Sequence, residues 1–126
     1  MDYKFSNLNK TWILDLDGTI LLHNGHINEP YIDTILPGVK EFFENKVKVG
    51  DFVLITTART EEHRQKTIDF LNKNKIRYDN IIFGLPHGER ILINDRKNSG
   101  LKTSYGINIK RNEGFENIKI TIDEDL

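Results

Sequence analysis

The chain has 126 residues and a mass of 14.7 kDa, a length that predicts a single domain, residues 1–126, with a substantial core. Its formal net charge of -1, from 18 basic and 19 acidic residues, provides no overall attraction to nucleic acid or to an anionic membrane. The absence of cysteine excludes disulfides and thiolate zinc sites, and the first residues lack the apolar core of a signal peptide. We therefore expect a cytoplasmic protein with small-molecule partners rather than nucleic-acid or membrane partners.

The first ten residues are polar, and we expect them to be a short lead-in. The stretch 12–19, Trp-Ile-Leu-Asp-Leu-Asp-Gly-Thr, is an apolar run interrupted by Asp15 and Asp17 and broken by Gly18. This pattern predicts a buried strand that delivers two carboxylates to its carboxyl end, where open α/β sheets bind ligands. Two acids so close together indicate a bound metal ion or a shared proton. Alternatively, they are solvated acids at a turn.

Residues 20–30 contain an Asn24-Gly25 turn signal, with His23 and His26 beside it. We interpret both as ordinary loop histidines rather than metal ligands, with substrate contact by one of them left open. The apolar stripe of Val39, Phe42, Phe43 and Val47 then predicts a helix over 40–47. The short connection before it leaves no room for an inserted domain.

Residues 51–60 form the second informative stretch, an apolar strand that ends at Thr56 and continues into Thr57-Ala58-Arg59. A hydroxyl, turn amides and a following helix over 61–74 are suited to binding an anion. Thr60 is explained equally well as a helix cap. We expect Arg59 rather than Arg64 to bind phosphate or sugar-acid oxygens.

Further along, residues 80–84 predict a short strand, and 91–98 predict an apolar strand that ends in Asn94-Asp95. An Asn-Asp turn after an ordinary strand is the alternative. Residues 104–109 predict a last core strand, and 117–122 an edge strand able to pair between subunits. The oligomeric state is therefore left open between monomer and homodimer.

The segment Asp15-Leu16-Asp17-Gly18-Thr19 resembles the first signature motif of the haloacid dehalogenase (HAD) superfamily. Thr56 stands where that family's second motif places a phosphate-binding hydroxyl, and Asn94-Asp95 resembles its acidic fourth motif. The resemblance runs from about residue 11 to 109. It departs at the third motif, where Leu85 stands in place of a frequent Lys. We expect Arg90 to supply the missing positive charge, with Lys97 as the alternative.

The resemblance implies an α/β fold, a three-layer Rossmann-like HAD core whose mostly parallel sheet is covered on both faces, with a small flap and no cap domain. It also implies a magnesium-dependent phosphatase acting through an aspartyl phosphate. Asp15 would be the nucleophile and Asp17 the general acid and base. Thr56 and Arg90 would stabilise the transferring phosphoryl group.

The family further implies that Mg²⁺ is held by Asp15, Asp95 and the main-chain carbonyl of Asp17, with Asn94 as a possible additional ligand. The substrate-binding residues expected beside them are Gly18, Thr57, Arg59 and Lys97. The pattern is similar to small phosphatases of bacterial capsule and lipopolysaccharide sugar synthesis, which suggests a small phosphorylated metabolite, a sugar phosphate first.

Three alternatives stay open. Open, capless relatives also act on nucleic-acid ends or phosphoproteins. A catalytically degenerate HAD fold could serve in binding or assembly, an interpretation suggested by Leu85 and Asn94. A receiver-type signalling module also clusters acids on a parallel sheet, although the order Asp-x-Asp-Gly-Thr argues against it.

Overall fold

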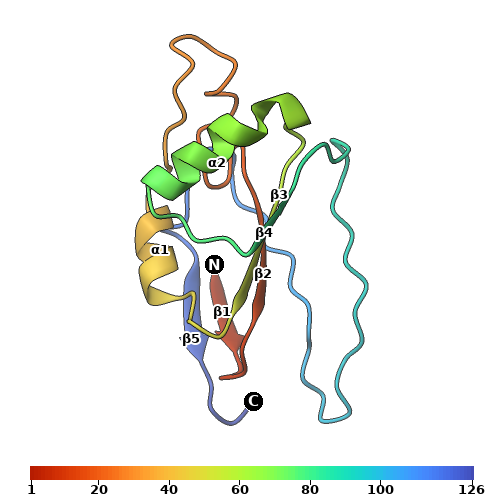
Figure 1. The fold of residues 1–126 in the computed structure, drawn as a ribbon. Helices are drawn as coiled ribbons and strands as arrows, with labels where there is room; N and C mark the ends of the chain where they lie inside the picture. The colour runs from red at the N-terminus through yellow and green to blue at the C-terminus, as the bar shows by residue number, and fades with distance from the viewer.

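The computed structural model describes all residues, 1–126, and contains five strands, two α-helices and one 3-10 helix (Figure 1). They are β1 (Asp2–Phe5), β2 (Thr11–Asp15), α1 (Val39–Asn45), β3 (Phe52–Thr56), the 3-10 helix η1 (Glu61–His63), α2 (Arg64–Lys73), β4 (Asn80–Ile82) and β5 (Lys119–Ile122). All strand pairs between them are parallel, and they form two separate sheets with no closed barrel. The fold is a small α/β arrangement, as the sequence predicted at that level.

The larger sheet has the order β2-β3-β4. These are the three apolar runs predicted as strands near residues 12–15, 52–56 and 80–84. In the parallel register Asp15 lies opposite Thr56, and Thr56 lies opposite Ile82. The carboxyl ends of the three strands therefore meet at one edge of the sheet, the edge where the candidate site residues were expected to converge.

The second sheet pairs β1 with β5, so that the first and last strands of the chain lie side by side (Figure 1). Describing residues 1–10 as a lead-in was wrong for 2–5. Phe5 is buried, and its ring lies 4.8 Å from that of Tyr105 and 6.5 Å from that of Trp12. The strand predicted in 117–122 is present as β5, and its partner in this structure is β1 of the same chain.

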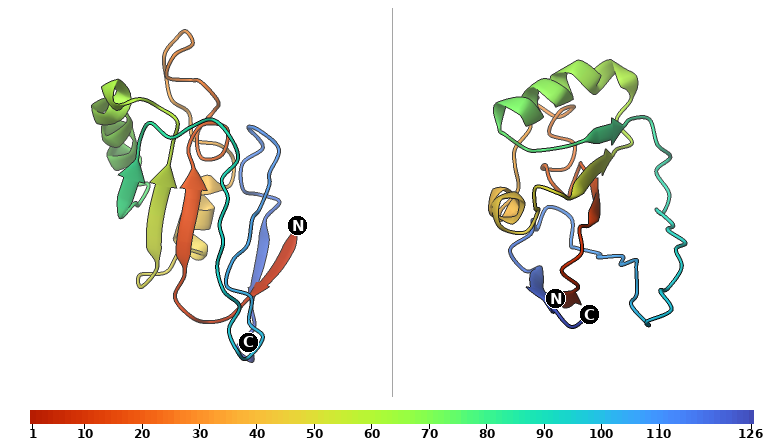
Figure 2. Two further views of the ribbon diagram at one scale, coloured as in Figure 1. Left: turned by 90° about the vertical axis from the view of Figure 1, so that its right-hand side faces the viewer. Right: turned by 60° about the horizontal axis from the view of Figure 1, so that its bottom comes forward.

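Both α-helices lie on the same face of the three-stranded sheet (Figure 2). The expectation of helices on both faces is therefore wrong. Because successive side chains of a strand point to opposite faces of the sheet, their exposure differs. Trp12, Val53 and Ile81 are buried, whereas Ile13 and Phe52 are about half exposed. The helices predicted over 40–47 and 61–74 are present as α1 and as η1 followed by α2.

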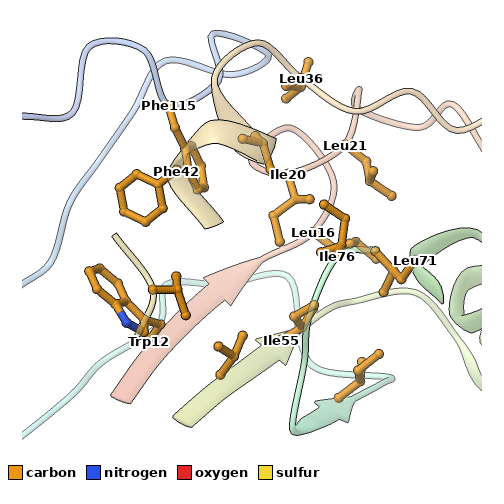
Figure 3. Close-up of a cluster of buried hydrophobic side chains, with 14 of the residues drawn as sticks. Trp12, Leu16, Ile20, Leu21, Leu36, Phe42, Ile55, Leu71, Ile76 and Phe115 are labelled. Carbon is orange, nitrogen blue, oxygen red and sulfur yellow. The ribbon is translucent and has the colours of Figure 1, made fainter. Parts of the chain in front are cut away.

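The core fills the space between the sheet and the two helices (Figure 3). Near α1, the ring of Phe42 packs edge-on against those of Trp12 and Phe115, at centroid distances of 5.4 and 4.9 Å. Leu16, directly between the two acidic residues of the first motif, is completely buried. Because a buried side chain is fixed by its neighbours, it anchors the turn that carries the acids.

Residues 84–118 contain no helix or strand, so the strands predicted at 91–98 and 104–109 are wrong. This segment leaves the carboxyl end of the sheet, runs past the opposite end, turns and returns (Figures 1 and 2). Ile91 and Ile93 are 83% and 91% exposed. A β-branched run forms a strand only where a strand edge lies beside it, and here no strand pairs with the run.

No helix in the structure has both the length and the apolar composition that crossing a bilayer requires.

Candidate functional site

The site begins with Asp15 at the end of β2 and Thr56 beside it at the end of β3. The Asp15 carboxylate accepts a hydrogen bond of 3.0 Å from the Thr19 hydroxyl, and its side chain is 45% exposed. Gly18 has a φ of +83°, a conformation that favours glycine, and the amides of Ile20 and Leu21 both donate to the Leu16 carbonyl. This turn brings Thr19 back onto Asp15.

Arg90 is the cation that approaches the Asp15 carboxylate. One of its terminal nitrogens lies 3.9 Å from the Asp15 carboxylate, and the other donates to the carbonyls of Pro86 and Gly88 at 3.1 and 3.0 Å. Of the two residues expected to replace the missing third-motif cation, the structure brings Arg90 to Asp15. Lys97 instead lies at the turn of the 84–118 segment, where its amide donates to the Leu101 carbonyl.

Asp17 is held by Arg59, which also binds Asp33. Arg59 donates to both oxygens of Asp17 at 3.0 and 2.9 Å and to both oxygens of Asp33 at 3.1 and 2.7 Å. Its remaining N–H donates to the Thr67 hydroxyl at 2.9 Å. All five N–H groups of the guanidinium are thus used. Arg59 was expected to contact substrate, but here it positions Asp17 and has no free donor for phosphate.

Two pKa shifts accompany this cluster. Burial lowers the pKa of Arg59, but hydrogen bonds and charges from Asp17 and Asp33 outweigh it, so the net shift is upward. For His26, burial and then the charge of Arg59 lower the pKa below its usual value, although Asp17 opposes them. Neutral His26 is therefore favoured at neutral pH. Its Nδ1 is buried without a hydrogen bond, 3.6 Å from Asp17, and its ring packs edge-on against His63.

A cleft of about 1460 Å³ opens in front of these residues. It is lined by Asp15 and Asp17 at the end of β2, by His23 and His26 from the loop after β2, and by parts of the 84–118 segment that include Arg90. That loop is closed at its base by an antiparallel bridge between residues 21 and 35. A cleft of this volume has room for a small-molecule ligand.

Several predicted site residues do not contact Asp15 and are engaged in other interactions. Asn94 donates to Thr103, and the Thr103 hydroxyl donates to the main-chain carbonyl of Asp95, so both residues bridge the two legs of the 84–118 segment. No contact joins either of them to Asp15. Thr57 is buried, and its amide donates to the Ile82 carbonyl. Gly18 lies in the turn itself.

Two groups of ligand atoms are candidates for a cation. Asp15 offers an accessible carboxylate, and no backbone N–H donates to the nearby Asp17 carbonyl. Mg²⁺ accepts such a set because it is commonly bound by one or two carboxylates, with waters and substrate phosphate as the other ligands. Asp17, His26 and Asp33 also place ligand atoms within 4.8 Å of one another and could hold a metal ion of unknown identity. An ion there would have to displace Arg59 from both carboxylates.

The sequence analysis missed Asp33 and the turn around Asn112. Asp33 is a single acid in a loop and has no local pattern that would mark it. Asn112 donates its amide to the Gly18 carbonyl at 2.9 Å and accepts from the His23 amide at 2.8 Å. The surrounding sequence, Lys110-Arg111 before it and Glu113-Gly114 after it, indicates a turn. It does not indicate which part of the protein that turn contacts.

Comparison with known proteins finds no match: no family model, no curated protein and no solved structure matches the chain.

Proposed function

We propose that this protein is a magnesium-dependent phosphomonoesterase of the HAD type. The observation that carries the proposal is the pairing of Asp15 with Thr56 at the ends of adjacent parallel strands, with Arg90 3.9 Å from the Asp15 carboxylate. A nucleophilic carboxylate, a hydroxyl and a cation around one point are the groups that phosphoryl transfer requires.

In the first step an oxygen of Asp15 attacks phosphorus in line. The bond between phosphorus and the leaving oxygen breaks as the new bond forms, and Asp17 gives its proton to the leaving alkoxide. In the second step Asp17 takes a proton from a water molecule that attacks the aspartyl phosphate, releasing phosphate and restoring Asp15. Thr56 and Arg90 stabilise the charge on the equatorial oxygens in both steps.

The Asp15 carboxylate and the main-chain carbonyl of Asp17 would hold Mg²⁺. When bound, the ion neutralises charge on the phosphate and helps to orient it. Arg59 orients the Asp17 carboxylate through two hydrogen bonds, one to each oxygen. For Asp17 to act as the proton donor, one of these hydrogen bonds would have to be released so that its oxygen can carry the proton.

The HAD core itself is part of the proposal. β2 is an edge strand with an unpaired side, and the exposed run Ile91-Leu92-Ile93 is a suitable partner for it across the cleft. In this structure the run leads away from the carboxyl end of the sheet, opposite to the direction of β2 (Figure 1), so the connection over 84–90 would have to rearrange before the run could pair in parallel. Such pairing would extend the sheet and carry Asn94 and Asp95 to its carboxyl end. Asp95 would then join Asp15 as a metal ligand.

For the substrate, the proposal favours a small phosphorylated metabolite, a sugar phosphate first, because no inserted domain covers the cleft. The test is a panel of phosphomonoesters incubated with the purified protein and Mg²⁺, with phosphate release as the readout. Release that EDTA abolishes and added Mg²⁺ restores supports the proposal.

A binding or assembly role is the second candidate. It is favoured by the separation of Asn94 and Asp95 from Asp15, which leaves few ligands for a metal. Absence of hydrolysis across the whole panel, with no change on Asp15→Asn substitution, would support this candidate over the phosphatase.

A further inference from the structure

A turn formed by residues 110–114 docks on the first motif. The Glu113 amide donates to the Lys110 carbonyl, and Asn112, with a φ of 66°, bonds to both Gly18 and His23. Asn is one of the few residues that adopt this left-handed conformation readily. The turn therefore contacts both the strand end that carries Asp15 and the loop that carries the histidines.

The same turn is anchored to the core on its other side. Gly114 has a φ of +83° and lies so close to the Pro37 carbonyl that a Cβ would not fit. The next residue, Phe115, is 4% exposed, and its amide donates to the same carbonyl at 2.9 Å. The position of the turn is thus fixed by packing and hydrogen bonds on both sides.

Arg111 projects from this fixed turn over Gly18. A Cβ on Gly18 would lie 3.2 Å from Cγ of Arg111, and the Arg111 side chain lines the cleft. It makes no salt bridge, and its side chain makes no hydrogen bond within the protein. By contrast, Arg59 is fully occupied by Asp17 and Asp33, and Arg90 lies beside Asp15. Arg111 is therefore a free cation held at the site.

The position of Arg111 indicates which anionic group it binds. Arg90 lies at Asp15, where the transferring phosphoryl group would bind, whereas Arg111 lies against Gly18, beside which His23 also packs. His23 belongs to the loop that also brings His26 to Asp17, the group that would protonate the leaving oxygen. Arg111 is thus on the leaving-group side of the cleft.

We propose that Arg111 binds a second anionic group carried by the leaving group, so that the preferred substrate is a phosphomonoester bearing a carboxylate or a second phosphate. A guanidinium suits either anion because it can donate two parallel hydrogen bonds. This inference rests on the proposed phosphatase function.

Two matched substrate pairs test it, and they separate the two anions. Phosphoglycerate is compared with glycerol phosphate for the carboxylate, and glucose bisphosphate with glucose phosphate for the second phosphate. We expect the wild type to prefer the more acidic member of at least one pair. Arg111→Gln should lower kcat/KM for that member roughly tenfold more than for the partner that lacks the second anionic group, the size of one lost charge-assisted hydrogen bond. Arg111→Lys should restore part of the preference.

Lys110→Gln is the matched control, because it removes the same charge from the same turn at a residue that does not line the cleft. It should affect both members of each pair alike. Equal effects of Arg111→Gln on both members, or no preference in the wild type, would overturn the inference. In that case, hydrolysis of p-nitrophenyl phosphate by the wild type would still support the proposed phosphatase function. A wild type that hydrolyses no phosphomonoester would overturn both.

Discussion

Asp33 and Arg59 form a buried ion pair in which both carboxylate oxygens accept hydrogen bonds, at 2.7 and 3.1 Å, from the guanidinium. Their side chains are only 3% and 1% exposed. The pair ties the loop after β2 to the end of β3, and the same guanidinium holds Asp17. The orientation of the proposed proton donor therefore depends on an acid elsewhere in the chain.

Asp33→Asn should destabilise the protein by about 3–5 kcal/mol, because it leaves part of a buried charge without its partner. Urea denaturation followed by fluorescence of Trp12, the only tryptophan, measures the change. Asp69→Asn, on the exposed face of α2, is the control and should shift stability by no more than about 0.5 kcal/mol. Equal stability of the two variants would show that the ion pair contributes nothing.

Arg90→Gln should lower kcat about 100- to 1,000-fold, the usual effect of removing one group that stabilises charge in a transition state. Its stability should change little because the side chain is 41% exposed. Arg96→Gln removes an exposed charge that has no partner and is the control. A loss of activity shared by both variants would argue that net charge, rather than the position of Arg90, matters.

Acid should destabilise the protein through Asp51. Burial raises the pKa of this carboxyl, but hydrogen bonds from the amides of Lys48 and Lys10 and from the Trp12 indole outweigh it and lower the pKa overall. A carboxyl with a lowered folded pKa contributes stability above its unfolded pKa, about 3.9, and that contribution is lost as pH falls through the folded value.

Asp51→Asn should therefore cost about 2 kcal/mol near pH 7 and reduce the loss of stability on acidification below about pH 4. Denaturation curves at a series of pH values measure both effects. Asp125→Asn, in the exposed tail, should match the wild type throughout. If Asp51→Asn and the wild type lose the same stability in acid, the role of Asp51 is refuted.

The proposed pairing of residues 91–95 with β2 predicts a change in amide hydrogen exchange. With Mg²⁺ and beryllofluoride, a phosphate mimic, exchange over 91–95 should slow because these amides gain backbone partners. Exchange over 119–122 should stay the same, since β5 is already paired with β1. Unchanged exchange over 91–95 with ligand bound would leave Asp95 outside the site.

The sequence predicts the parts of the fold that depend on local patterns. The apolar runs that became β2, β3 and β4 and the helical stripe of α1 are continuous in the chain, so their periodicity alone marks them. The convergence of Asp15 and Thr56 also followed from the sequence, because parallel strands bring their carboxyl ends to one edge. The expectation that Arg90 lies near Asp15 rested on the family resemblance, whose third motif requires a cation that Leu85 does not supply.

The remaining features depend on contacts between distant segments. β1 is short and lies in a polar context, and its partner β5 is at the other end of the chain. Asp33 has no local pattern, yet it shares Arg59 with Asp17. The run 91–95 has strand-like residues but no neighbouring edge in this structure, so propensity alone gave the wrong answer.

The most direct test of the central claim is phosphate release from p-nitrophenyl phosphate by the wild type and by Asp15→Asn, both with Mg²⁺. The account predicts turnover by the wild type and a loss of at least about 1,000-fold in kcat for the variant, because the nucleophile is removed while the size of the side chain is kept. Comparable rates for the two proteins would contradict it.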